Sequence, residues 1–93
     1  MILIIGRFQV RSEQLASFQR LARSLVIEER RVEGCVGFDI LQDVAQSDHF
    51  VMLEQWQDRA ALDHHLASAA YTRNDAALNR FVVGEPDWAE YEV

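Results

Sequence analysis

The amino-acid sequence predicts one α+β domain, residues 1–93, built on a four-stranded antiparallel sheet. Three observations support this fold class. Runs of β-branched and aromatic residues bounded by turn residues occur near both ends and in the middle of the chain. Segments with the apolar periodicity of surface helices separate these runs. No repeat, low-complexity tract or Pro/Gly-rich linker divides the chain, so every segment is expected to belong to one fold.

The first strand is predicted over Ile2–Val10, which has too few polar positions for a surface helix. A helix follows, with Ser12 as its expected N-cap. Glu33-Gly34 is expected to end this helix, because glycine readily takes the left-handed conformation found after a helix C-terminus. The apolar side chains between these points recur in one continuous stripe: Leu15, Phe18, Ala22, Leu25 and Val26.

Two further strands are predicted over Cys35–Asp43 and His49–Trp56. The polar-leaning segment 44–48 between them has the length of a hairpin connection, so the two strands are expected to pair antiparallel. Asp58 is a good N-cap for a short helix that runs through Ala67. This part of the chain therefore predicts a hairpin that leads directly into a helix.

The last third of the chain predicts a second helical segment and a final strand. The helical pattern places Tyr71, Leu78, Phe81 and Val82 on one side, and Gly84-Glu85-Pro86 is expected to end it. Trp88–Val93 is then the last strand. The resulting order of strand, helix, strand, strand, broken helix and strand is the split βαβ arrangement of ferredoxin-like folds.

Helices in this arrangement can cover only one face of the sheet, yet both faces are predicted to be apolar. An uncovered apolar face forgoes roughly 1.5–3 kcal/mol of burial for each large side chain, so a second copy of the sheet is its simplest cover. A sheet-on-sheet homodimer is therefore expected, with a monomer that keeps an apolar face as the alternative. The residues concerned are Ile2, Ile4, Phe8, Phe50 and Met52 on one face and Leu3, Ile5, Val51 and Leu53 on the other.

Composition excludes several classes of protein. Acidic residues outnumber basic ones 15 to 9, for a net charge of −6, which argues against nucleic-acid binding. There is no basic membrane face, and the apolar start Met1–Ile5 is too short for a signal peptide. Cys35 is the only cysteine, so it has no partner for an internal disulfide or a zinc site. A cytoplasmic protein without membrane or metal is predicted.

The segment Phe50–Leu66 carries Glu54 and Trp56 two residues apart on a strand, followed by a helix with Leu62 and His65. This pattern resembles the signature of the antibiotic biosynthesis monooxygenase (ABM) domain family. The likeness covers essentially the whole chain, including Glu33-Gly34-Cys35 with Phe38 inward and the first strand with Gly6-Arg7-Phe8. It implies a dimeric α/β barrel with a pocket between each subunit's sheet and helices. In the best-understood members, molecular oxygen oxidises aromatic phenols or quinols without any cofactor.

Alternation along the third strand places Phe50, Met52, Glu54 and Trp56 on one face, which the resemblance directs toward the pocket. A carboxylate in an apolar strand either has a partner or has a raised pKa, and either state suits a group that binds or deprotonates a phenol. The alternative is that Glu54 pairs with an arginine such as Arg7 or caps a helix. Trp56 is expected either to stack on a flat substrate or to pack in the core.

Two adjacent histidines are distinguished by helical geometry. His65 borders the apolar face, whereas His64 is expected to point to solvent. His65 also matches the family's helix-two histidine, so His65 and Glu54 are the candidate general bases, with a hydrogen-bonding role as the alternative for His65. Tyr71 and Asn74 on the last helix could bind a substrate oxygen, Tyr71 as plain core being the alternative. The histidines show no metal-ligand spacing, so no metal is predicted.

Three functions compete at this point. The first is a cofactor-independent monooxygenase, although Met52 and Leu62 stand where a polyketide-oxidising relative carries Asn and Tyr, which leaves the substrate open. The second is haem degradation, which in family relatives uses a histidine on the last helix that this chain lacks. The third is a non-catalytic dimeric small-molecule binding module. An isomerase acting on a phosphorylated substrate would need a basic cradle, which the predicted pocket does not offer.

Overall fold

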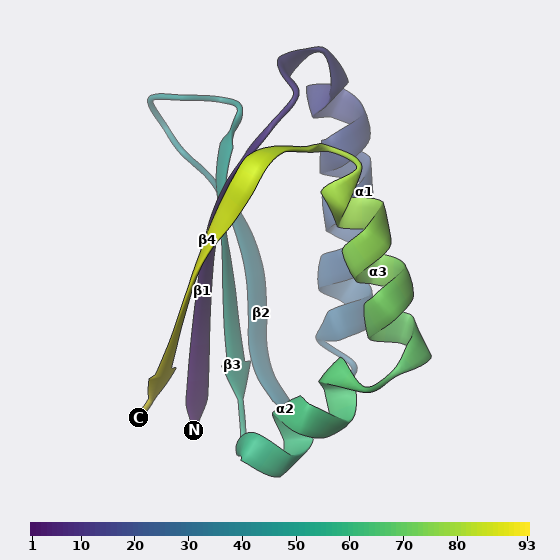
Figure 1. Cartoon of the computed structure of the whole chain (residues 1–93), viewed down its shortest axis with the longest axis vertical. Coiled ribbons are helices and arrows are strands. Elements are labelled where there is room, and N and C mark those ends of the chain that lie inside the picture. The colour runs from purple at the N-terminus through teal and green to yellow at the C-terminus, as the bar shows by residue number, and fades with distance from the viewer.

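The computed structural model describes residues 1–93 and consists of one antiparallel sheet with all helices on one of its faces (Figure 1). The strands lie in the order β2-β3-β1-β4. This order confirms the predicted ferredoxin-like arrangement. The elements in chain order are β1 (Ile2–Val10), a 3-10 turn (Ser12–Gln14), α1 (Leu15–Glu29), β2 (Cys35–Gln42), β3 (His49–Trp56), α2 (Arg59–Leu66), α3 (Ala69–Asn79) and β4 (Val82–Glu92).

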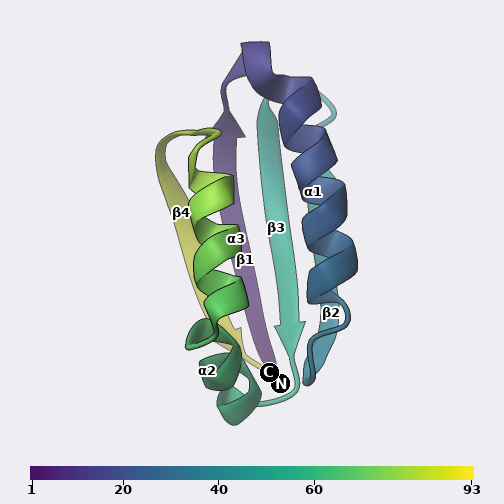
Figure 2. The same cartoon turned by 90° about the vertical axis from the view of Figure 1, so that its right-hand side faces the viewer.

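The central strand β1 pairs antiparallel with β3 on one side and with β4 on the other. The predicted hairpin of β2 and β3 is confirmed, and β3 has the predicted limits. Asp58 caps α2 as expected, because its side chain accepts a hydrogen bond from the backbone N–H of Ala61. On this sheet, α1 and α3 lie side by side over the same face (Figure 2).

The core between sheet and helices is divided into two clusters. The larger cluster joins the apolar stripe of α1 to β1 and β3, with the rings of Phe18 and Phe50 4.7 Å apart. The smaller cluster consists of Ile2 from β1, Trp56 from β3 and Leu62 from α2, all of them buried. The division matters for function because the cavity described below is bordered by residues of the larger cluster and by a histidine that stacks on the smaller one.

The start and end of α1 differ from the prediction. Ser12 does not cap the helix: it lies in the 3-10 turn, and α1 begins at Leu15 after Gln14, which makes no side-chain cap. The helix ends at Glu29 rather than at Glu33-Gly34. Gly34 does have the expected positive φ, of 86°, but it serves the turn that leads into β2.

The helix α3 also ends earlier in the sequence than predicted. The helix stops at Asn79, and β4 begins at Val82 rather than at Trp88, so Gly84-Glu85-Pro86 lies within β4 instead of ending the helix. Proline is tolerated there because β4 is an edge strand. The pairing of β1 with β4 shifts register between Arg7 and Gln9. Gly84-Glu85-Pro86 therefore forms a bulge in β4.

No helix covers the opposite face of the sheet (Figure 1). Cross-strand partners share a face, so the pairing of Ile5 with Leu53 and of Leu41 with Val51 puts apolar side chains on this uncovered face. Leu41 and Tyr91 are about half exposed there. None of the helices is long and apolar enough to cross a bilayer.

Candidate functional site

A cavity of about 310 Å³ lies between the sheet and the helices. Residues from every strand and every α-helix contribute to its wall, and nine of the fifteen are hydrophobic. A mainly apolar cavity with a few polar groups is the usual form of a small-molecule site. Five of the seven residues predicted for the site line it: Met52, Glu54, His65, Tyr71 and Asn74.

The other two predicted residues, Phe50 and Trp56, are buried outside the cavity wall. Phe50 packs in the larger core cluster between Phe8 and Phe18. Trp56 is completely buried in the smaller cluster, which corresponds to the core alternative for this residue. Its indole lies 4.6 Å from the ring of His65 and nearly parallel to it, so Trp56 acts on the site by holding this histidine from behind.

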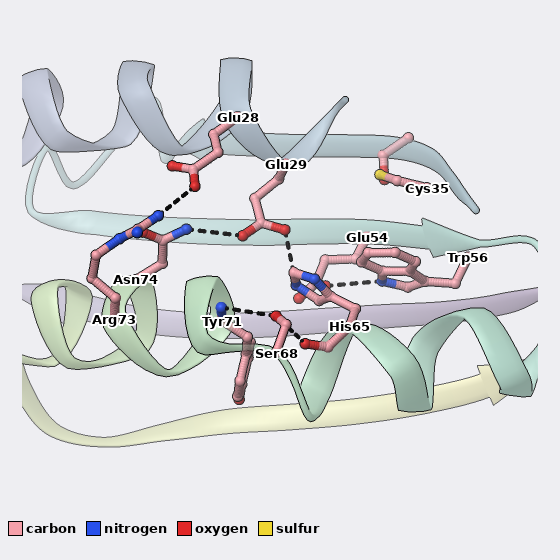
Figure 3. Close-up of polar contacts among 11 residues, drawn as sticks. Glu28, Glu29, Cys35, Glu54, Trp56, His65, Ser68, Tyr71, Arg73 and Asn74 are labelled. Carbon is pink, nitrogen blue, oxygen red and sulfur yellow. Dashed lines mark hydrogen bonds and ion pairs between the residues drawn. The ribbon is translucent and has the colours of Figure 1, made fainter. Parts of the chain in front are cut away.

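His65 is buried near the C-terminal end of α2, with only 4% of its surface exposed, and three groups hold it. Trp56 stacks on one side of the ring, and the ring of Tyr71 meets it edge-on at 5.5 Å. Its Nε2 lies 2.9 Å from Oε2 of Glu29 (Figure 3). His64, by contrast, is exposed, as helical geometry predicts. These contacts fix the imidazole at the cavity wall.

Glu29, the last residue of α1, is a site residue that sequence reasoning missed. It is 4% exposed, and its Oε1 accepts a hydrogen bond of 3.2 Å from the side-chain amide of Asn74. Its Oε2 has no aligned hydrogen-bond donor, although Nε2 of His65 is within ion-pair distance. The signal was its spacing: Glu29 follows Leu25 by four residues and Ala22 by seven, so it continues the apolar stripe of the helix.

Glu54 lies on the cavity side of β3 and accepts a hydrogen bond of 3.0 Å from Nε1 of Trp56. The suggested partner Arg7 is wrong, because Arg7 is exposed and pairs across the sheet with Val51 on the opposite face. Burial raises the pKa of Glu54, and the nearby carboxylate of Glu29 raises it further, while the hydrogen bond from Trp56 and the proximity of His65 lower it. Glu54 therefore has both a donor partner and a raised pKa.

Tyr71 and Asn74 extend from α3 into the same cavity (Figure 3). The pKa of Tyr71 is raised, first by burial and then by the negative charges of Asp75, Glu54 and Glu29. Its phenol therefore stays protonated and can donate a hydrogen bond. Ser68 orients the start of α3, because its hydroxyl accepts from the backbone N–H of Tyr71 and donates to the carbonyl of His65.

Trp88 and Glu90 of β4 also line the cavity, and the sequence did not predict them. Trp88 lies across β1 at Gly6, where an added Cβ would be 2.3 Å from its ring. The missing side chain at Gly6 is therefore what allows the indole to form part of the wall. Glu90 is held by two hydrogen bonds from Arg59, of 2.6 and 3.3 Å, which tie β4 to α2.

Comparison with known proteins identifies the family. The model described as "Antibiotic biosynthesis monooxygenase" matches residues 1–77. The chain belongs to the antibiotic biosynthesis monooxygenase family. The Bacillus subtilis (strain 168) protein "Putative monooxygenase YcnE" is 35% identical over 71 residues, which make up 76% of this chain and 75% of YcnE.

Solved structures agree with membership in the ABM family. The crystal structure of a "putative antibiotic biosynthesis monooxygenase" from Deinococcus radiodurans superposes with a TM-score of 0.90 at 26% identity, covering 100% of this chain and 92% of that one. SnoaB, a cofactor-independent oxygenase from Streptomyces nogalater, superposes with a TM-score of 0.86 over 99% of this chain and 91% of its own. At 18% identity, the likeness to SnoaB shows a shared fold.

The site of this ABM protein combines groups that accept protons with groups that donate hydrogen bonds. His65 and Glu54 can accept a proton, whereas Tyr71 and the amide of Asn74 can donate a hydrogen bond. All four lie in the wall of a cavity that is otherwise mainly apolar. Such an arrangement can hold a small polar aromatic molecule and move a proton from its hydroxyl group. No group of three or more His, Cys, Asp or Glu side chains in the chain is arranged to hold a metal ion.

Proposed function

We propose that this protein is a monooxygenase that oxidises a small aromatic phenol or quinol with molecular oxygen and uses no metal or organic cofactor. The observation that carries the proposal is the mainly apolar cavity with His65 and Glu54 in its wall. Family membership supports the reaction class, and the names of YcnE and SnoaB are consistent with it. The size of the cavity, about 310 Å³, lies at the lower end of the range for small-molecule sites.

The proposed reaction begins with removal of the phenolic proton by His65 or Glu54. A well-placed base accelerates such a step by roughly 10²–10⁴. A proton accepted by the imidazole of His65 would be stabilised by the carboxylate of Glu29, whose Oε2 lies 2.9 Å from Nε2. The electron-rich anion then reduces oxygen and forms a C–O bond to it, and the peroxide anion takes the proton back from the base to give a hydroperoxide. Loss of water from the resulting hydroperoxide leaves one oxygen atom in the product as a carbonyl, and the substrate supplies all four electrons.

Oxygen uptake tests this proposal. The wild-type protein is expected to consume oxygen with at least one member of a panel of hydroquinones and hydroxylated anthrones. His65→Gln and Glu54→Gln keep the side-chain size but remove the base, so each is expected to lower the rate by at least tenfold if that residue is the base. His64→Gln is the matched control, because His64 is the exposed neighbour of His65. Unchanged rates in both site variants would exclude these bases.

A non-catalytic binding module is the second candidate function. The observation that favours it is the approach of Glu29 to Nε2 of His65, because a histidine held by a carboxylate can be purely structural. This candidate predicts that members of the same panel bind to the cavity without any oxygen uptake. Ligand binding measured by calorimetry beside the oxygen electrode therefore separates the two functions.

We further propose that two copies pair through the uncovered face of the sheet. The proposal is supported by a row of apolar side chains on the uncovered face of β1 and β3, which includes Leu3, Ile5 and Leu53. In a single chain no layer covers these side chains. Sedimentation equilibrium is expected to give twice the 10.7 kDa mass of one chain. Val51→Lys is expected to give the single-chain mass, because a charge in the centre of the interface cannot be paired with its own symmetry copy.

A further inference from the structure

We infer that the cavity selects its aromatic ligand by charge: it binds a phenol that carries a neutral or positively charged hydrogen-bond donor, received by Glu29, and it rejects anions. The inference rests on the proposed function, since the ligand is the phenol that would be oxidised. It adds to that proposal a substrate class and a residue that determines it.

The first support is the charge of the cavity wall. Four carboxylates line it and no lysine or arginine does. Only Glu90 has an arginine partner, Arg59, because the Asn79 side chain that donates to Asp75 is an uncharged amide. Glu29 and Glu54 have no lysine or arginine partner. An anionic ligand would therefore meet acidic groups that have no lysine or arginine partner, at a partly buried wall where charge repulsion is stronger than in water.

The second support is the incompletely hydrogen-bonded carboxylate of Glu29. This carboxylate is almost fully buried in the cavity wall, and Asn74 occupies only its Oε1. Buried polar atoms are nearly always hydrogen-bonded, yet Oε2 has no aligned donor, because Nε2 of His65 lies 2.9 Å away but is not aligned with it. Figure 3 shows the carboxylate of Glu29 reaching from α1 toward His65 and Asn74 on the opposite side of the site. Because Glu29 lines the cavity, an N–H or O–H group of a bound ligand that reaches its carboxylate would supply an aligned donor.

The third support is the aromatic part of the wall. Tyr71 and Trp88 both line the cavity, and Trp88 is 46% exposed, so the face of its indole is available to a ligand. Aromatic faces attract both flat rings and cations, whereas they repel anions that approach the ring face. The aromatic wall and the acidic wall therefore favour the same ligands.

Three phenols that share one framework test the inference: tyramine is a cation at neutral pH, tyrosol is neutral and 4-hydroxyphenylacetate is an anion. Their dissociation constants are measured by calorimetry without oxygen, so that no turnover interferes. We expect tyramine and tyrosol to bind the wild-type protein at least tenfold more tightly than the anion. Glu29→Gln keeps the size of the side chain and removes its charge. It is therefore expected to reduce the preference for tyramine, measured as the affinity for tyramine divided by the affinity for 4-hydroxyphenylacetate, by about tenfold.

Glu33→Gln is the matched control, because Glu33 is exposed and its loss changes the net charge by the same amount. Three results would overturn the inference: an anion that binds wild type as tightly as tyramine, no binding by any of the three phenols, or an equal loss of affinity for all three in Glu29→Gln. The wild-type series does not depend on how well any variant folds. A protein that shows the charge order but consumes no oxygen would refute the proposed oxygenase while leaving the selectivity intact.

Discussion

Replacing His65 with alanine is expected to destabilise the fold by about 2–4 kcal/mol, a cost that follows from the contacts of the imidazole. Removing the ring forfeits its stacking on Trp56, and aromatic pairs contribute about 0.5–1.5 kcal/mol beyond burial. It also takes away the polar group nearest to Oε2 of Glu29, and a buried polar atom without a partner costs about 1–3 kcal/mol. Both side chains are about 95% buried, so solvent screening does not reduce these costs substantially.

Urea unfolding followed by circular dichroism measures this cost. A domain of this size has a stability of about 5–14 kcal/mol, so His65→Ala remains folded and its midpoint can be compared with that of wild type. His64→Ala is the control and is expected to change stability by less than about 0.5 kcal/mol. The two residues are in contact, so their effects should not add. The double variant with Glu29→Ala is expected to lose less stability than the sum of the two single variants, by at least about 1 kcal/mol. Equal effects of His65→Ala and His64→Ala would refute the described packing of His65.

Three further variants test separate parts of the structure. Gly6→Ala is expected to displace Trp88, since the new Cβ would overlap its ring, and so to shift tryptophan emission to longer wavelength; unchanged emission would contradict this placement. Gly34→Ala is expected to cost at least about 2 kcal/mol in urea unfolding, because φ is +86° and the Cβ would lie 2.4 Å from that of Ala61. Because the pKa of Glu54 is raised above the ordinary value of 4.5, the contribution of Glu54 to stability declines as pH rises above 4.5. The stability of Glu54→Gln relative to wild type should therefore increase between pH 4.5 and 8, and parallel profiles would contradict this.

The first three strands and the hairpin were predictable because their signals are local. Alternation and β-branched residues define β3 to the residue, and the side chain of Asp58 fixes the start of α2. The errors lie where tertiary contacts decide. Gly84-Glu85-Pro86 reads as a helix terminator, but pairing with β1 takes these residues into an edge strand as a bulge.

The candidate site was predictable to the extent that it follows from periodicity. Alternation placed Met52 and Glu54 on the cavity side of β3, and helical geometry separated His65 from His64. Glu29 escaped notice because a charged residue on an apolar stripe is normally assigned to the surface, and only its contact with His65 reveals its position. Trp88 escaped notice because its place depends on the register of β4 against Gly6, which no local pattern encodes.

The central claim is that a small aromatic ligand binds in the cavity between sheet and helices. Two-dimensional ¹⁵N–¹H NMR with tyrosol added in the absence of oxygen tests it most directly. The largest shifts are expected at the indole N–H of Trp88, the side-chain amide of Asn74 and the backbone of Tyr71, which all belong to the cavity wall. Shifts confined to Val51, Leu53 and their neighbours on the uncovered face of the sheet would contradict the claim.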